Sequence, residues 1–273
     1  MNLFKIEMKK NLKGSIIWGI VLFGILFLYL AFFPSMKDAG FSELLDGKLN
    51  MMPQGLLDSL GLKDMPDFSI FMEYYSYVFQ FVVIGASVYA MILGTKALSK
   101  EEGEKTIEFL YAKPVTRSKI VFSKMTSSIV SLFIVAGMVL AASILADVIF
   151  ANGKDIIIIL LVNLMMMIPT FVYWSIGFVI SAFLKDDNKS IIIALGIFFG
   201  TYLIGIIAAT IDKLEILKYL SPINYNPAVD VFKFFDGRAG AVLNMTAIVI
   251  STVIFIAGII TTYIKYNKKD LLN

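Results

Sequence analysis

Long apolar runs dominate the pattern of hydrophobic and polar positions along the chain. A membrane-spanning α-helix needs roughly 20 largely apolar residues, and six runs of about that length occur here. They hold no Asp, Glu, Lys or Arg except near their ends, where Lys124 and Asp147 lie. The pattern predicts an all-α integral membrane protein with a single transmembrane domain over residues 1–273. The predicted spans are residues 15–33, 74–95, 124–146, 156–182, 190–211 and 246–264.

Composition agrees with this class and excludes several kinds of chemistry. Hydrophobic residues make up 58% of the chain and charged residues 16%, whereas a soluble domain has about 25% charged residues. The absence of Cys and His removes disulfides, thiolate nucleophiles, His metal ligands and His general bases. Asp147 and Asp212 lie at predicted span borders, not as a buried pair for an aspartyl protease. We therefore expect no catalytic residue, no metal site and no cofactor bound by the chain itself.

The loop charges predict the orientation. Of the Lys and Arg residues, 16 fall in both terminal segments and the second and fourth loops, and 8 fall in the other loops. Because cytoplasmic loops carry the excess of Lys and Arg, we expect a multi-pass cell-membrane protein with both termini in the cytoplasm. The run at 15–33 is longer than a typical signal-peptide core and lacks a following small-x-small cleavage site, so we expect a retained anchor.

The N-terminal segment, residues 2–13, has helical periodicity before the first span. An apolar stripe and a basic stripe run side by side, which is typical of an amphipathic helix on the inner leaflet. Simple anchoring by positive charge, without an ordered helix, is the alternative. The apolar stripe is Phe4, Met8 and Leu12, and the basic stripe is Lys5, Lys9 and Lys13.

Two long segments lie on the predicted outer side. Residues 34–73 contain three Pro and short apolar pieces, which predict short packed or interfacial helices. Residues 212–245 contain a helix-breaking Ser221-Pro222 turn followed by the apolar stretch from Val229 to Phe235. That stretch predicts either a broken helix that re-enters the outer leaflet or an amphipathic helix on a surface loop.

The connection between the second and third spans has a strong helix signal. Ser99 and Glu102 fit a capping box, and Glu101 and Lys105 form a favourable i,i+4 pair. Pro114 ends the pattern, so we expect a short amphipathic cytoplasmic helix over about residues 100–112. Such a helix is either a headgroup-bound connector or an element that docks into a groove on a soluble partner.

The same connection resembles the coupling region of type-2 ATP-binding-cassette (ABC) exporter permeases. The matching residues are Glu101-Glu102-Gly103, Thr106, Glu108, Leu110 and Pro114-Val115-Thr116-Arg117. Tyr111-Ala112-Lys113 departs from the small apolar residues common before the Pro. The six spans, the short basic N-terminal segment and the Ser-Pro turn before the last span extend the resemblance over the whole chain.

The resemblance implies a transport subunit that works with other chains. A second permease, identical or different, would pair with this one, and separate cytoplasmic ABC ATPase subunits would bind ATP and Mg. The chain has no Gly-x-x-x-x-Gly-Lys-Ser/Thr loop, so it lacks the usual phosphate cradle. No nucleic acid partner is expected. The implied ATPase-coupling interface consists of Glu101, Glu102, Gly103, Thr106, Ile107, Glu108, Leu110, Pro114 and Arg117.

The spans themselves favour an external energy source. Ion-coupled transporters keep ionisable side chains near the bilayer centre, and the predicted span centres have none. An ATP-independent secondary transporter or channel is the alternative function. The lack of charge also favours an apolar or amphiphilic substrate, whose identity stays open. Gly196 and Gly200 form a Gly-x-x-x-Gly pair that predicts a helix contact.

Overall fold

The computed structural model describes residues 3–38, 66–103, 115–184, 187–238 and 240–269. Every regular element within these ranges is helical. The elements are α1 (Leu3–Leu30), α2 (Phe33–Asp38), α5 (Phe71–Gly103), α7 (Arg117–Phe150), α8 (Ile156–Phe183), α9 (Asp187–Thr210), η1 (Asp212–Leu220), η2 (Pro222–Asn224), α10 (Ala228–Phe235) and α11 (Met245–Lys268).

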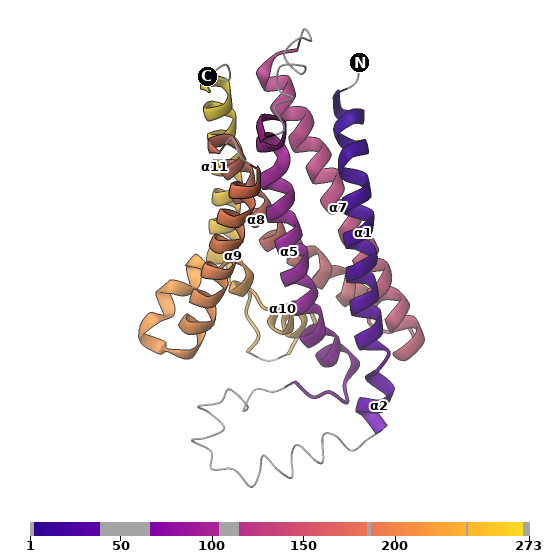
Figure 1. Cartoon of the computed structure of the whole chain (residues 1–273). Coiled ribbons are helices and arrows are strands. Elements are labelled where there is room, and N and C mark those ends of the chain that lie inside the picture. Colours follow the sequence, from indigo (N-terminus) through magenta and orange to yellow (C-terminus); the bar gives the residue numbers. More distant parts are fainter. Residues whose placement is uncertain (1–2, 39–65, 104–114, 185–186, 239, 270–273) are drawn as a thin grey trace.

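Six of the helices are long and apolar enough to cross a membrane, which confirms the predicted number of spans. They are α1, α5, α7, α8, α9 and α11, and they form one elongated bundle (Figure 1). The first turn of α1 and the last turn of α11 lie at the same end of this bundle. We call it the termini end; α5 finishes there and α7 begins there. The opposite end, with α2 and α10, is the distal end.

Helix α5 is the central element of the bundle. It packs against α1, α7, α8, α9 and α10. Its closest approach is to α8, where a Cβ added at Gly94 would lie 2.3 Å from the Trp174 carbonyl oxygen. A Cβ added at Gly177 would lie 2.4 Å from the Met91 carbonyl oxygen. Both distances are too short for any side chain, so these two glycines let the backbones touch, as small residues do in membrane helix pairs.

The predicted contact at Gly196 and Gly200 is wrong for the described part of the chain. A Cβ added at either residue meets no atom within 4 Å there. The glycine of α9 that makes a close approach is Gly205, where an added Cβ would lie 2.5 Å from the Ser221 hydroxyl oxygen. Sequence spacing identified the pair but not the direction in which that face of α9 points.

The N-terminal segment is ordered, but it differs from the predicted leaflet helix. Residues 3–13 continue directly into the first span as α1. The buried positions there are Leu3 and Glu7, whereas Leu12 is exposed. Packing of α1 on α7 therefore selects a different face from the Phe4, Met8 and Leu12 stripe.

Residues 221–235 form two short helices, which both predictions for this segment allow. Pro222–Asn224 forms η2, and Ala228–Phe235 forms the short helix α10. Ala228, Val231 and Phe232 are buried, and α10 packs against α5 and α8. The apolar face of α10 therefore lies on protein, and the choice between a re-entrant helix and a surface helix stays a prediction. For residues 34–73, α2 accounts for Phe33–Asp38, while 39–65 lie outside the described residues.

We expect Gly177→Val to disrupt the bundle, because the α8 backbone cannot move away from α5 without losing the whole contact. Overpacking of this kind destabilises proteins by about 1–3 kcal/mol. Thermal denaturation of the purified protein in detergent measures the effect. Gly196→Val is the matched control, since its added side chain meets open space. Equal stability of the two variants would contradict the assigned contact.

Candidate functional site

The predicted coupling interface borders the termini end of the bundle. Glu101, Glu102 and Gly103 form the end of α5, and Arg117 is the first residue of α7. The structure thus brings the two flanks of the interface to one end. The other predicted members, Thr106, Ile107, Glu108, Leu110 and Pro114, lie outside the described residues.

The predicted capping box at Ser99 is wrong. Helix α5 is continuous from Phe71 to Gly103, so Ser99 lies within a helix and does not start one. Its buried hydroxyl donates to the Thr95 carbonyl at 2.7 Å, a bond that hydroxyls make inside helices. Sequence reasoning took a polar residue after an apolar run as a helix start, but the second span extends beyond its apolar part.

Arg117 connects two helices at the termini end. Its guanidinium donates to the main-chain carbonyls of Lys269 at 2.7 Å and Asn267 at 3.1 Å, where α11 finishes. A cation is favourable there, because the last carbonyls of a helix lack intrahelical donors. The adjacent Thr116 caps α7 by accepting from the Lys119 amide. These bonds hold the start of α7 to the end of α11, a link that spacing in the sequence did not indicate.

A buried ion pair joins α1 to α7 near the same end. Lys124 Nζ lies 3.3 Å from a Glu7 carboxylate oxygen, and their side chains are only 3% and 7% exposed. Lys10 lies 3.4 Å from the other oxygen of the same carboxylate, and Asn11 donates to Ser127 at 3.3 Å. Sequence reasoning missed Glu7 as a partner. The available signal was that Glu7 is the one acid before residue 38.

This pair lines the termini cavity, which is the largest of three cavities bordered by described residues of α5. Its volume is 230 Å³, and it lies between α1, α5 and α7. Tyr89 and Trp18 form part of its wall, with ring centroids 5.4 Å apart. The charged residues of the lining are Glu7, Lys10, Lys96, Lys100 and Lys124.

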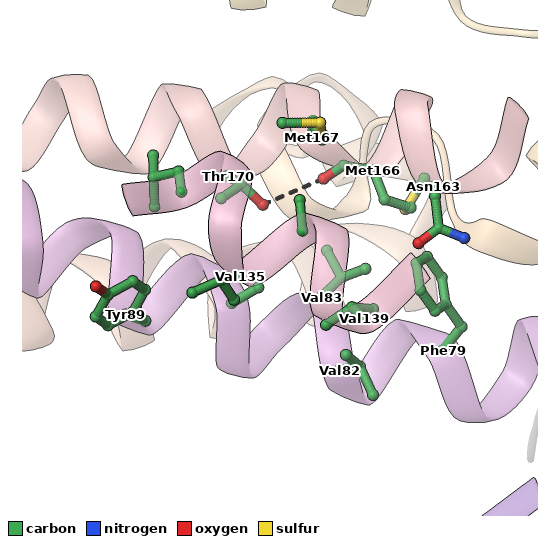
Figure 2. Close-up of a pocket in the computed structure, with 13 residues that line it drawn as sticks. Phe79, Val82, Val83, Tyr89, Val135, Val139, Asn163, Met166, Met167 and Thr170 are labelled. Carbon is green, nitrogen blue, oxygen red and sulfur yellow. Dashed lines mark hydrogen bonds between the residues drawn. The ribbon is translucent and has the colours of Figure 1, made fainter. Parts of the chain in front are cut away.

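The middle cavity is small and apolar. It has a volume of 40 Å³ and is lined by α5, α7 and α8. Figure 2 shows Val83, Val135 and Val139 between Tyr89 on one side and Asn163 on the other. Asn163 donates to the Tyr75 hydroxyl at 2.8 Å, which in turn donates to Ser143 at 3.0 Å. Because a water needs at least about 10–15 Å³ of such volume, only very small molecules fit here.

The distal cavity combines apolar walls with neutral polar groups. It has a volume of 210 Å³ and lies between α5, α9, η2 and α10. Gln80, Tyr202 and Asn224 supply amide and phenol groups, and the rest of its described lining is apolar. No Asp, Glu, Lys or Arg belongs to that described lining.

The three cavities follow one another along α5 and share wall residues. Tyr89 lines both the termini cavity and the middle cavity. Val83 and Met166 line both the middle cavity and the distal cavity. The Tyr89 hydroxyl is held 2.9 Å from the Ser15 hydroxyl. These side chains form the walls that neighbouring cavities share.

An ion pair at the distal end holds the segment after α10 against α5. Arg238 donates to Glu73 at the start of α5 and to Asp236, and these two bonds raise the pKa of Arg238 above its usual value. Its guanidinium also lies 4.8 Å from the Phe232 ring centroid. Nearby, burial and the negative charge of Asp236 raise the pKa of Asp155. Within the described ranges no three His, Cys, Asp or Glu side chains group as a metal site would require.

Comparison with known proteins assigns the family. No curated protein sequence is similar enough to this chain to count as a match. The family model described as "ABC-2 family transporter protein" matches residues 1–271, which is nearly the whole chain of 273 residues. Six apolar helices form the described structure, as a membrane subunit requires. The chain therefore belongs to the ABC-2 family of transporter proteins, as a permease subunit that is not itself an ATPase.

Proposed function

We propose that this chain is the membrane-spanning subunit of an ATP-driven exporter for an apolar or amphiphilic substrate. The observation that carries the proposal is the family match over residues 1–271. Partnership with ATPase subunits follows from the family, and we assign ATP and Mg binding and hydrolysis to those separate subunits. A second permease, identical or different, completes the transporter.

The proposed orientation places the termini end in the cytoplasm of a cell-membrane protein. The supporting observation is the charge imbalance: 16 Lys and Arg residues belong to the two terminal segments and the second and fourth loops, and 8 belong to the other loops. The positive-inside rule orients such a protein with its basic end inward. ATPase subunits in the cytoplasm would then meet the connection between α5 and α7.

The proposed coupling runs from that connection into the bundle. Residues 101–103 continue α5, and α5 lines all three cavities. Arg117 links the start of α7 to the end of α11. A force applied between Gly103 and Arg117 would therefore move the helices that separate the cavities. We assign ATPase contact to Glu101, Glu102, Gly103, Thr106, Ile107, Glu108, Leu110, Pro114 and Arg117.

The cavity linings support the proposed substrate class. The distal cavity offers amides, a phenol and apolar walls without an acid or base among its described lining, which suits an amphiphile. The middle cavity is mainly apolar. A secondary transporter or channel is less well supported, because the described linings of the middle and distal cavities include no carboxylate or ammonium group for ion coupling.

Reconstitution tests the proposed function. The chain would be purified together with the ABC ATPase encoded beside its gene and inserted into liposomes. We expect lipid-like, hydrophobic-peptide or hydrophobic-drug substrates to stimulate ATP hydrolysis and to move across the bilayer only when ATP is present. Substrate movement of equal rate without ATP or the ATPase would support the channel or secondary-transporter function and contradict the exporter.

Charge reversal in the predicted interface should uncouple transport. Glu102→Lys and Glu108→Lys each place a cation where we expect a carboxylate to face the ATPase. If the opposing ATPase group is a cation, the two like charges then repel each other, which costs several kcal/mol of binding free energy. We expect substrate-stimulated ATP hydrolysis to fall by about tenfold or more while membrane insertion is unchanged.

The matched control for charge reversal is Glu215→Lys, in η1 at the distal end. It makes the same change in charge far from the interface, so its stimulated activity should equal that of the wild type. Normal coupling in both the Glu102 and Glu108 variants would remove these residues from the interface.

Arg117 variants test the link between α7 and α11. Arg117→Ala should weaken ATPase association or coupling, because the guanidinium positions both helix ends. Arg117→Lys keeps the charge but replaces the planar guanidinium with a flexible ammonium group whose position is less fixed, so we expect partial recovery at best. Co-purification of the ATPase and stimulated hydrolysis measure both effects. If Arg117→Ala leaves both the complex and its activity unchanged, Arg117 contributes only to the membrane orientation of the chain through its positive charge.

A further inference from the structure

Three side chains in the distal cavity carry hydrogen-bonding groups that the fold itself does not use. They are the amides of Gln80 and Asn224 and the phenol of Tyr202. Within the described ranges, none of these three side chains forms a hydrogen bond with another protein group. The nearby Asn226 side chain differs, because it donates to the Asn244 carbonyl at 3.5 Å and accepts from the Asn244 amide at 2.8 Å. Asn226 thus holds the start of α11, whereas the three cavity groups can bind a molecule that enters the cavity.

The two long helices direct their polar side chains into this cavity together with apolar neighbours. On α5, Val83 and Ile84 follow Gln80 by three and four residues, and all three line the cavity. On α9, Ile206 follows Tyr202 by four residues, and both line the cavity. Residues three and four apart lie on the same face of a helix, so each polar group belongs to a helix face that borders the cavity.

Gly205 lets the third polar group reach the same space. A Cβ added at Gly205 would overlap the amide nitrogen of Asn224, so η2 can lie this close to α9 only because Gly205 has no side chain. Gly205 follows Tyr202 by three residues, which places the Asn224 amide beside the turn of α9 that carries the phenol. The three groups therefore come from three different elements that meet at one cavity.

The other lining side chains decide which polar groups the cavity accepts. All of them in the described lining are apolar, and none is an acid or a base. An ionised group would lose its water there without a counter-charge, which costs several kcal/mol. A hydroxyl or amide also loses water, but it regains hydrogen bonds to the amides and the phenol. The cavity therefore favours an uncharged polar group.

The cavity also gives an attached alkyl chain a way out. Its volume of 210 Å³ suits a headgroup and not a whole amphiphile. Ile206 lines the cavity and is also exposed on the outside of α9, as is Leu203 three residues earlier. Since these two positions are neighbours on the helix surface, an alkyl chain can leave the cavity along an apolar part of α9.

We infer that the distal cavity recognises the uncharged headgroup of an amphiphile, with hydroxyls or amides, through Gln80, Tyr202 and Asn224. All three side chains can both donate and accept hydrogen bonds, as hydroxyl-bearing and amide-bearing headgroups do. The role of this amphiphile as the transported substrate rests on the proposed export function. Binding itself needs no ATPase and can be measured on this chain alone.

Photocrosslinking of the purified full chain in lipid nanodiscs tests the inference. The probe is a dodecyl maltoside with a diazirine next to the headgroup, used below the concentration that dissolves the nanodiscs. We expect crosslinks at the cavity-lining parts of α5, α9 and α10. Dodecyl maltoside should compete through its hydroxyls, and dodecanoyl alaninamide should compete through its amides; the stronger competitor identifies the headgroup type. Dodecyltrimethylammonium and dodecyl phosphate, which carry a charge on the same chain, should compete at least about tenfold less well.

Conservative variants test the three polar groups. Tyr202→Phe removes only the phenol oxygen, so the affinity for the probe should fall about two- to tenfold, as expected for one uncharged hydrogen bond. Tyr77→Phe is the matched control, because it removes the same group from α5 outside the cavity lining, and its affinity should equal that of the wild type. Gln80→Met/Asn224→Leu keeps the side-chain size and should lower the affinity about tenfold or more. The Tm of each variant without probe checks that it is folded.

Three results would overturn the inference. They are crosslinks that avoid the cavity lining, equal competition by the charged amphiphiles, and equal loss of affinity in Tyr77→Phe and Tyr202→Phe. In liposomes with the ATPase, export of the probe by Gln80→Met/Asn224→Leu at the wild-type rate and concentration dependence would remove the cavity from substrate recognition. A probe that binds in the cavity but is not moved by ATP would contradict the proposed export function and leave the binding site supported.

Discussion

The backbone contact between α5 and α8 is the constraint on which the rest of the bundle depends. At Gly94 and Gly177 the two helices approach so closely that no side chain fits between them. In lipid, apolar side chains gain little by leaving the solvent, so close packing of small residues supplies much of the attraction between helices. This contact fixes α5 in the centre, where it can border α1, α7, α9 and α10 as well. All three cavities are consequences of that central position.

Polar contacts set the two ends of this apolar structure. Near the termini end, the Glu7–Lys124 pair holds α1 on α7, and Arg117 holds α7 to α11. At the distal end, Arg238 holds the segment after α10 to α5 through Glu73. A buried ion pair is poor evidence of net stability, but removing one partner leaves an uncompensated charge. These pairs therefore specify which helix ends stay together.

The sequence predicted the spans well because each span requires a long run of residues without charge. This signal can be read without knowing which helices pack against one another. It predicted α10 for a similar reason, since Val229 to Phe235 has a clear apolar face. It failed where a partner decides the outcome. Gly94 and Gly196 are the same residue type within an apolar helix. Gly94 contacts the backbone of α8, whereas Gly196 faces open space in the described structure.

The predicted site was harder for the same physical reason. Ser99 has the side chain of a helix cap, yet burial within α5 turns its hydroxyl to Thr95. Glu7 and Lys124 are 117 residues apart, and no local spacing links them. Arg117 was singled out by resemblance, whereas its bonds to the end of α11 come from tertiary structure. The coupling residues between Gly103 and Val115 stay a prediction.

The proposed function requires that the connection between α5 and α7 face the cytoplasm and contact an ATPase. The chain contains no Cys, so a single cysteine can carry a photoreactive crosslinker to one chosen position. The most direct measurement places it at residue 107 or, in a second protein, at the exposed Ile216 of the distal end, and identifies the crosslinked partner by mass spectrometry in intact cells. We expect an ABC ATPase adduct from position 107 and none from position 216. An ATPase adduct from position 216 alone, or from neither position while the complex co-purifies, would contradict the proposed function.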